Sequence, residues 1–270
     1  MITLTLKEQP EVPLEAETLC PDVLATLATY AIRELPVYLG RQRRRIEDFF
    51  VVEGEASDEI EIRGDAANIK WIGRRMTRGR IAITGDAGMH LGAQMTGGTI
   101  EVSGNVSDWL GAEMSGGLIR VHGNAGGQVG AAYRGSISGM TDGTIIVDGA
   151  AGLEIGMRMK RGIIAVGGPV RESAGLLMKG GTLVLRNGAE LRTGAWMSRG
   201  TIISLAPIRI LPTFSYAAAY NPTFVRLYAR YLGLLGFTIP CEEQDGAYQR
   251  YTGDAAAPGK GELLVWKPRA

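Results

Sequence analysis

The sequence predicts an all-β solenoid: a single-stranded β-helix of about seven 19-residue coils, capped at both ends by N-terminal and C-terminal α/β segments. Three observations lead to this prediction. Glycine accounts for 39 of the 270 residues, about twice its usual share of roughly 7%. Thirty-one of these glycines lie between Gly64 and Gly200. Within that segment they recur at a fixed interval, and each interval holds one short segment of alternating apolar residues.

The recurring pattern is G-x-x-M-x-x-G-x-I-x-V. Its second glycine falls at Gly79, Gly98, Gly117, Gly143, Gly162, Gly181 and Gly200, so the successive intervals are 19, 19, 26, 19, 19 and 19. An interval of 19 is too short for a pair of helices and too regular for a β-sandwich, but it fits one coil of a solenoid. Strands stacked about 4.8 Å apart complete one another's backbone hydrogen bonds. Equivalent positions of successive coils should therefore lie one above the other.

Three series of apolar residues are expected to form ladders inside the coils. Residues i and i+2 of a strand share a face, so Ile81 and Ile83 should point inward and Arg80 and Ala82 outward. The other two series are the methionines of the motif and the residues that precede its first glycine. They comprise Met76, Met95, Met114, Met159, Met178 and Met197, and Ile72, Leu91, Leu110, Val129 and Ile155.

The corners of the coils are marked by polar residues that follow a glycine at the end of a strand. These residues are Asp65, Asp86, Asn105 and Asn124, whose side chains can bond the turn backbone and stack as a ladder. The segment GNAGGQVG, residues 123–130, superficially resembles a nucleotide-binding loop. Its glycines recur in six further coils and no helix pattern follows, so a Rossmann or phosphate-binding loop is rejected.

Residues 1–59 are predicted to form an N-terminal cap with one helix and a first, irregular coil. The stretch VLATLATYAIREL, residues 23–35, has helical spacing and ends at Pro36. Residues 37–39 and 49–52 read as strands. They flank a basic turn that contains Arg41, Arg43, Arg44 and Arg45. These arginines are candidates to contact an anionic tail, although isolated basic turns are more often solvated.

Residues 60–205 are assigned to the glycine-rich β-helix, which one insertion interrupts. Seven extra residues, Arg134 to Met140, enter the coil in which Tyr133 is expected to take the methionine position. The insertion should bulge as a loop at one edge, and such loops commonly carry contacts.

Residues 206–270 are predicted to form a C-terminal extension with one amphipathic helix, from Asn221 and Pro222 to Gly236. Its apolar face is expected to comprise Phe224, Leu227, Tyr228, Tyr231, Leu234 and Leu235, with Arg226 and Arg230 opposite. In the later coils, outward strand positions become apolar, namely Ile146, Ile163, Val184 and Ile203. A contiguous apolar surface is usually covered, so we expect the C-terminal segment or another subunit to pack here. Together with Tyr133 and Arg134, these four residues are the candidate interface.

Composition excludes several classes of partner. The formal net charge is +1, which provides no overall field for attracting nucleic acid or an anionic membrane. The N-terminal residues do not resemble a signal peptide, and no apolar run approaches the ~20 residues of a membrane span. Cys20 and Cys241 lie far apart without CxxC or neighbouring histidines, so neither a disulfide framework nor a zinc site is suggested. We expect a cytoplasmic protein that contacts neither membrane nor nucleic acid.

No catalytic, cofactor-binding or metal-binding residues are predicted in this chain. His90 and His122 occupy different positions of the repeat. The equivalents of His90 in later coils are Trp109, Gln128, Glu154 and Ser173, a mixed series that indicates a varied surface. No GxSxG motif suggests a nucleophile, and adjacent acids such as Glu242 and Glu243 are usually solvated. Hexapeptide acyltransferases are also solenoids, but 19 is not a multiple of their period of six.

The GxxMxxGxIxVxG coils, the interrupted coil GAAYRGSISGMTDG and the segments KEQPEVPLEA and YNPTF resemble the C subunit of formylmethanofuran dehydrogenase over nearly the whole chain. The tail from Asn221 to Gly236, followed by RYTGDAAAPGKGELLVW, is more similar to the bacterial branch, the C subunit of the formyltransferase/hydrolase complex, than to the archaeal molybdenum or tungsten dehydrogenases. The coils alone also resemble the C-terminal domain of the glutamate synthase large subunit. These resemblances imply that the β-helix is right-handed.

The resemblance further implies a non-catalytic scaffold in a complex that converts formyl-tetrahydromethanopterin, via formylmethanofuran or an analogue, to formate during formaldehyde oxidation. An amidohydrolase-like subunit and a formyltransferase subunit would be the partners. The methanofuran-type coenzyme and any metals would belong to those partners and not to this chain. The competing hypothesis is an independent enzyme with its pocket on the solenoid flank or under the C-terminal segment, which would turn over formylated substrate alone.

Overall fold

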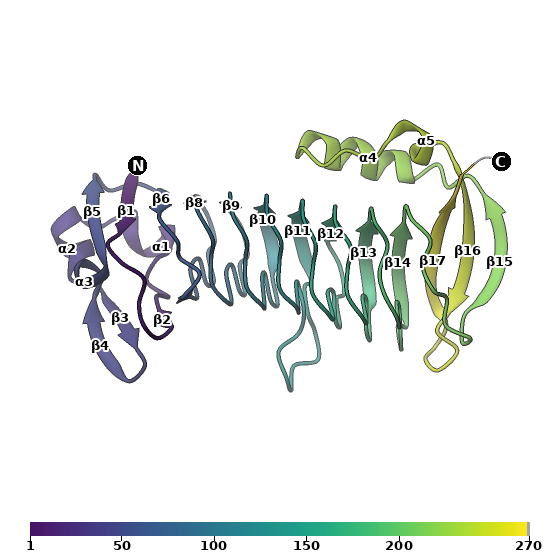
Figure 1. The fold of residues 1–270 in the computed structure, drawn as a ribbon, viewed down its shortest axis with the longest axis horizontal. Helices are drawn as coiled ribbons and strands as arrows, with labels where there is room; N and C mark the ends of the chain where they lie inside the picture. The colour runs from purple at the N-terminus through teal and green to yellow at the C-terminus, as the bar shows by residue number, and fades with distance from the viewer. Residues whose placement is uncertain (269–270) are drawn as a thin grey trace.

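The chain is mostly β-structure, and the computed structural model describes residues 1–268. The last two residues of the expected 206–270 extension lie outside the described residues. Thirteen strands form one large sheet, in the order β15-β16-β17-β14-β13-β12-β11-β10-β9-β8-β6-β1-β5. Most neighbouring strands in this sheet are parallel, and Figure 1 shows them side by side along the long axis of the molecule.

The centre of the sheet has the register that the repeat predicts. Its strands are β6 (Glu59–Arg63), β8 (Arg80–Thr84), β9 (Thr99–Val102), β10 (Ser115–Val121), β11 (Asp142–Val147), β12 (Ile163–Val166), β13 (Lys179–Leu185) and β14 (Arg199–Ser204). Ile81 pairs with Ile100, and Ile100 with Ile119. Ile119 pairs with Ile145 across the longer interval that holds the insertion, and the regular interval returns at Ile164. Equivalent residues therefore do lie one above the other.

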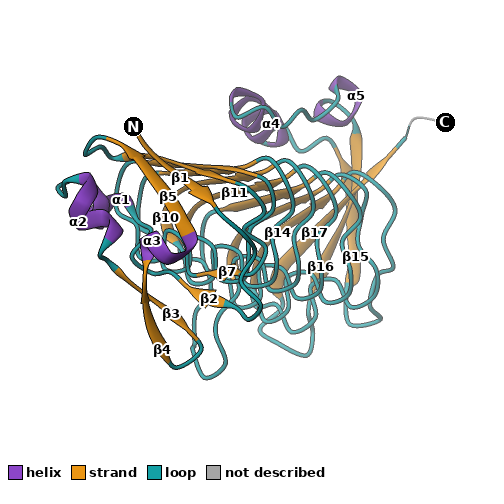
Figure 2. Cartoon of the chain, turned by 60° about the vertical axis from the view of Figure 1, so that its left-hand side comes forward, coloured by secondary structure: helices purple, strands orange, loops and turns teal. Residues whose placement is uncertain are grey.

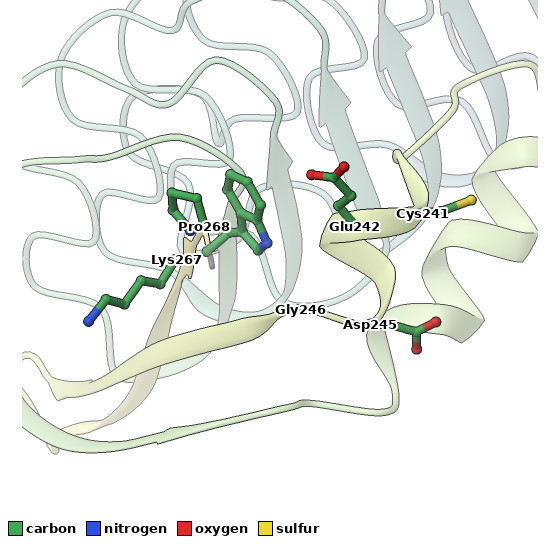
Figure 3. A pocket seen from close by; sticks show the side chains of 7 residues that line it. Cys241, Glu242, Asp245, Gly246, Lys267 and Pro268 are labelled. Carbon is green, nitrogen blue, oxygen red and sulfur yellow. The ribbon is translucent and has the colours of Figure 1, made fainter. Parts of the chain in front are cut away.

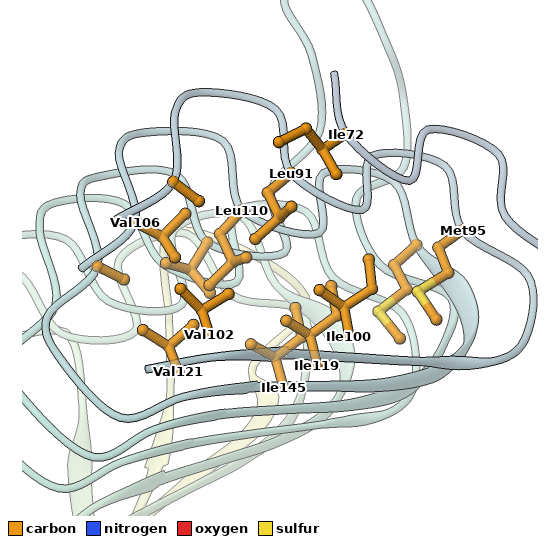
Figure 4. Packing of buried hydrophobic residues seen from close by; sticks show 14 of the residues in the cluster. Ile72, Leu91, Met95, Ile100, Val102, Val106, Leu110, Ile119, Val121 and Ile145 are labelled. Atoms are coloured by element: carbon orange, nitrogen blue, oxygen red, sulfur yellow. The ribbon is translucent and has the colours of Figure 1, made fainter. Parts of the chain in front are cut away.

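A second ladder runs parallel to the first on another side of the repeats. Single bridges join Ala66, Ala87, Val106, Ala125, Ala151, Val170 and Ala189 in sequence. The apolar ladders lie in the core between the strands and the row of single bridges (Figure 4), where Met95, Met114 and Ile100 are 0% exposed. Val102, Leu91 and Leu110 share this core. The three predicted inward series are confirmed.

The corner residues also stack as expected. The backbone N–H of Asn105 donates to Asp86 Oδ1 at 2.7 Å, and its side-chain amide donates to the same oxygen at 3.1 Å. Asn124 repeats both bonds to Asn105 Oδ1, at 2.9 and 3.0 Å. Ala150 N–H then donates to Asn124 Oδ1 at 2.8 Å. The Asx ladder thus satisfies backbone donors that the turns would otherwise leave unpaired.

The N-terminal end differs from the prediction in two respects. Its strands are β1 (Ile2–Leu6), β2 (Leu14–Glu15), β3 (Pro36–Leu39), β4 (Gln42–Arg45), β5 (Phe50–Gly54) and β7 (Ile69–Lys70). The expected continuous helix over 23–35 is wrong: the chain forms α1 (Pro21–Leu24) and α2 (Thr29–Arg33), and α3 (Ile46–Phe49) follows. Of the predicted basic turn, Arg41 does lie in a turn, but Arg43, Arg44 and Arg45 belong to β4, which pairs antiparallel with β3. β1 pairs parallel with β6, and β5 pairs antiparallel with β1.

The insertion keeps the methionine ladder intact in a way that the sequence prediction missed. Met140, at the end of the insertion, is 0% exposed, and its N–H and C=O bond Gly130 and Lys160. Tyr133 is only half-buried and lies outside this ladder. The assignment of Tyr133 to the methionine position is therefore wrong, because the chain bulges out before Met140 and returns in time to fill the core.

The C-terminal end contains more regular structure than the single predicted helix. It forms β15 (Ser215–Tyr220), α4 (Val225–Leu234), α5 (Cys241–Gln244), β16 (Ala247–Gly253) and β17 (Lys260–Lys267). β17 pairs parallel with β14, and β16 and β15 follow it antiparallel. The large sheet thus ends in antiparallel strands on both sides. No helix within residues 1–268 is long and apolar enough to cross a membrane.

Candidate interaction site

The C-terminal segment covers the apolar flank of the later repeats. Ile146, Val184 and Ile203 are each 0% exposed, and they form one cluster with Val225, Ala229 and Leu232 of α4 and with Phe237 and Ile239. Ile163 is half-buried at the border of this cluster. Figures 1 and 2 show α4 lying across the row of strands. Three of the four predicted flank residues therefore contact the chain's own C-terminal segment.

Polar contacts fix α4 on this flank. The Tyr231 hydroxyl lies 3.0 Å from Thr144 Oγ1, and the Tyr228 hydroxyl lies 2.9 Å from Thr182 Oγ1. Arg120 donates to the carbonyl of Leu235 at the end of the helix, and its Nη2 donates to both carboxylate oxygens of Asp148, at 2.8 and 2.9 Å. A guanidinium is well placed there, because the carbonyls of the last turn carry partial negative charge.

The orientation of α4 corrects the expected apolar face. Val225, Ala229 and Leu232 face the sheet, with Tyr228 half-buried beside them. Leu227 is 71% exposed, Tyr231 43% and Leu234 81%. At 3.6 residues per turn, Leu227 and Leu234 lie on the side away from the sheet. Tyr231 lies at the edge between this side and the sheet, where its hydroxyl meets Thr144. We call Leu227, Tyr231 and Leu234 the α4 stripe. The prediction was right for Phe224, Tyr228 and Leu235, which pack against the cluster, and wrong for Leu227 and Leu234, because apolar residues occur on both faces.

Beside α4, the outward strand positions carry a row of charged groups. Arg80 lies 2.7 Å from Glu101, whose second oxygen is 3.1 Å from His122 Nε2. His122 Nδ1 lies 3.0 Å from Asp148, which also holds Arg120. The hydrogen bonds from Arg80 and His122 hold the pKa of Glu101 below its ordinary value. Charges thus alternate from repeat to repeat until they reach the end of α4.

An aromatic cluster lies where the prediction placed a varied surface. The rings of Trp71 and His90 stack with centroids 4.0 Å apart and an 8° angle between their planes. Trp109 stacks on Tyr133 at 4.9 Å, and the Tyr133 hydroxyl lies 2.9 Å from His90 Nδ1. The Arg74 guanidinium lies 4.4 Å from the centroid of Trp71. We call Trp71, His90, Trp109 and Tyr133 the aromatic cluster.

Burial changes the protonation of this cluster. Desolvation, and to a smaller extent Lys70 and Arg74, lower the pKa of His90 to about 4. Burial also raises the pKa of Tyr133. His90 is therefore neutral near pH 7, and its prediction as an ordinary surface histidine is wrong. The missed signal was Trp71, which occupies the equivalent position one repeat before His90 and makes the start of the series aromatic.

The insertion loop is anchored next to this cluster. Arg158 donates to the carbonyl of Ser136 at 3.0 Å, and Lys179 donates to the carbonyl of Ile137 at 2.8 Å. Arg134 is exposed, and the Ile137 side chain at the tip is 70% exposed. Figure 1 shows the loop projecting on the side of the strands opposite α4. The loop therefore presents an apolar side chain from a fixed backbone.

Neither the predicted basic segment nor the cavities form a reactive arrangement. Arg44 pairs with Asp48 of α3, and Arg45 pairs with Glu47 of α3 and with Glu34 at the end of α2. A cleft of about 450 Å³ lies between α5 and the end of β17. Its Cys241, Glu242 and Lys267 side chains point in different directions (Figure 3). Among residues 1–268, no group of three or more His, Cys, Asp or Glu side chains is placed to hold a metal ion.

Comparison with known proteins gives partial and full-length matches. No family model matches the chain. It is 43% identical over 96 residues to the C subunit of tungsten-containing formylmethanofuran dehydrogenase 2 of Methanothermobacter marburgensis, covering 34% of this chain and 36% of that protein. It is 44% identical over 91 residues to the C subunit of molybdenum-containing formylmethanofuran dehydrogenase 1 of Methanothermobacter thermautotrophicus, covering 33% and 23%. These matches span about a third or less of the curated relatives.

The full-length match is to a solved structure. A chain in the crystal structure of the formyltransferase/hydrolase complex (FhcABCD) from Methylorubrum extorquens, in complex with methylofuran, superposes with a TM-score of 0.91 at 32% identity. The match covers 98% of this chain and 100% of that one. Because it extends over both whole chains, and the partial matches are to C subunits, this chain belongs to the family of formylmethanofuran dehydrogenase C subunits.

Proposed function

We propose that this chain is the non-catalytic scaffold subunit of a formyltransferase/hydrolase complex. That complex would convert formyl-tetrahydromethanopterin, via formylmethanofuran or an analogue, to formate. The observation that carries the proposal is the match over 98% of this chain and 100% of the similar chain. Both ends of the molecule are included, so the likeness is not limited to the glycine-rich repeats.

The physical argument for a scaffold is the stiffness of the stack. Each repeat is bonded to its neighbours through the strands, the bridges and the Asx ladder. We infer that residues 60–205 are a right-handed single-stranded β-helix, that 1–59 cap one end and that the 206–270 extension caps the other. Such a rod holds its flanks at fixed separations, which suits a subunit that positions larger partners.

We assign the coenzyme to the partners. The solved complex is described as bound to methylofuran. An amidohydrolase-like subunit and a formyltransferase subunit would carry the active sites, together with any metals. A cytoplasmic setting for this assembly is supported by the two free cysteines, Cys20 and Cys241.

The flank with the insertion is proposed as one partner surface. Ile137 is exposed at the tip of a loop whose carbonyls Arg158 and Lys179 hold in place. Tyr133 orders the base of the loop through His90, and Arg134 is exposed beside it. A preorganised apolar side chain loses little entropy on binding. Of the six candidate interface residues, Tyr133 and Arg134 lie on this flank, whereas Ile163 borders α4 on the other side.

Native mass spectrometry of the affinity-tagged chain, purified from its own organism, tests the proposal. We expect a complex that contains the formyltransferase and hydrolase subunits, while the chain purified alone should not turn over formylated substrate. Replacing Ile137 by Glu should weaken assembly without unfolding the chain, because this side chain is 70% exposed. Turnover by the isolated chain would instead support an independent enzyme.

The second candidate is the C subunit of a molybdenum or tungsten formylmethanofuran dehydrogenase. It is favoured by the 43–44% identity over about a third of the chain. Elemental analysis of the same purified complex distinguishes the two. Stoichiometric molybdenum or tungsten would favour the dehydrogenase, and its absence, together with formyltransferase activity, would favour the hydrolase complex.

A further inference from the structure

The α4 stripe is apolar surface that the fold leaves uncovered. Leu227, Tyr231 and Leu234 follow i, i+4, i+7 spacing, and they are 71%, 43% and 81% exposed. The opposite face of the same helix is fully packed on the sheet through Val225 and Leu232. A helix that is apolar on both sides is typically buried on both sides.

The backbone under the stripe is already fixed in the free chain. Tyr228 and Tyr231 bond to Thr182 and Thr144, and Arg120 holds the carbonyl of Leu235. The exposed leucines therefore project from a helix that needs no ordering on binding, which lowers the entropic cost of an interface.

The surroundings of the stripe indicate the chemistry of its partner. On one side lie two arginines. Arg226 pairs with Asp245, whereas Arg230 forms no ion pair within the described part of the chain. On the other side, Tyr231 borders a cleft over the starts of β10 to β12, lined by Gly116, Asp142 and Thr144. A partner would thus meet an apolar centre, a positive border and an adjoining recess.

These borders disfavour a second copy of the chain as the occupant. In an antiparallel pair of two α4 helices, equivalent borders face each other, so Arg230 of one copy would approach Arg230 of the other. Like charges across an interface are unfavourable. An apolar ridge that carries carboxylates along one border would be complementary to the stripe and to Arg230.

We propose that the α4 stripe is the centre of a docking surface for a different subunit, which contributes a helix with an apolar ridge bordered by Asp or Glu. The inference rests on the proposed scaffold function. Three side chains are too few for a stable interface, which buries about 800 Å² on each partner. The stripe is therefore the central cluster of a larger contact that continues into the recess beside Tyr231. It lies on the side of the strands opposite the insertion loop (Figure 1), so one rod would hold two partners apart.

The first test compares assembly of variants co-expressed with the other subunits of the complex from the same organism. Leu227→Glu combined with Leu234→Glu should weaken assembly at least tenfold, because carboxylates would replace the apolar centre and repel the acidic border. Arg230→Glu should weaken it severalfold, and Arg230→Lys should restore most of it. Tyr30→Glu is the matched control: Tyr30 is 76% exposed and belongs to α2 at the far end.

The second test measures whether the other subunits shield the α4 stripe from a reagent in solution. Leu234→Cys in a Cys241→Ser background should react quickly with a maleimide in the isolated chain and at least tenfold more slowly in the complex. Equal labelling rates, or unchanged assembly of the double Glu variant, would overturn the inference while leaving the scaffold function intact. A wild-type dimer that the double variant abolishes would assign the stripe to a second copy instead. Failure of the wild-type chain to recruit any other subunit would overturn both proposals.

Discussion

Residues other than glycine adopt the left-handed backbone conformation, with positive φ, at the corners of nearly every repeat. Trp71, His90 and Trp109 have φ of 69°, 64° and 67°. This conformation costs roughly 1–2 kcal/mol for a residue with a Cβ atom. Stacking of the rings contributes about 0.5–1.5 kcal/mol for each pair in addition to buried area. Stacking in the aromatic cluster therefore offsets the unfavourable backbone conformation at these corners. Through Tyr133, the cluster also links the insertion to His90 and Trp109 of earlier repeats.

The pKa of His90 leads to a prediction about pH. The folded pKa is about 4, whereas an unfolded histidine titrates near ~6.5. Between these values the unfolded chain binds more protons, so stability is full above about pH 6.5 and falls as the pH is lowered toward 4. His90→Gln should remove this part of the pH dependence, which is about 1–2 kcal/mol because water still screens a half-buried imidazole. Urea unfolding at several pH values measures it.

The reference for this prediction is the wild-type chain, unfolded in urea over the same pH range. If His90→Gln and wild type lose stability in parallel over that range, burial of a neutral His90 is not the cause.

At the scale of the element, the close stacking of repeats depends on glycine at the start of each strand. Gly117 has φ of +90°, and a Cβ atom there would lie 2.6 Å from Met95 Cε and 2.8 Å from the Gly98 carbonyl oxygen. The equivalent Gly143 would meet Met114 at 2.7 Å. The methionine of one repeat thus fills the space that glycine leaves open in the next.

Gly117→Ala is expected to destabilise the protein by about 2–4 kcal/mol, from unfavourable backbone conformation and overpacking together. Gly135→Ala separates the two causes. Gly135 has a similar φ of +88°, but no atom lies within 4 Å of its added Cβ. Gly135→Ala should therefore lower the free energy of unfolding by only about 1 kcal/mol. If thermal or urea unfolding shows the same loss of stability for Gly117→Ala and Gly135→Ala, overpacking against the stacked methionine does not contribute to the destabilisation.

At the scale of the molecule, the strands of the repeats stack side by side along its long axis (Figure 1). Each strand from β8 to β14 pairs its backbone with its two neighbours in the stack. The stability of proteins built from stacked repeats is approximately a sum over the repeats and their interfaces. The two ends differ, because antiparallel strands flank the parallel ones there. They leave the parallel strands β6 to β14 without an open edge at either end of the stack.

Deleting residues 85–103 removes one whole repeat and joins Thr84 to Gly104, the equivalent of Gly85. The shortened chain should remain folded, with a β-rich circular dichroism spectrum, cooperative melting and a slightly lower Tm. Trp71 would then stack next to Trp109. Deleting only residues 85–94 breaks the register and should abolish folding. Unfolding of both variants would contradict independent repeats.

The sequence alone determined how the repeats stack on one another. Strand register, the inward apolar series, the Asx corners and the single longer interval all follow from periodicity, because each residue's main neighbour is its own equivalent one repeat away. The docking of the two ends depended on the tertiary structure. Tyr231 meets Thr144 across 87 residues, and Arg120 meets Leu235 across 115. No repeat relates these segments. The face that α4 buries, and the stripe that it leaves exposed, therefore depend on how the C-terminal segment packs against the outward face of the folded sheet.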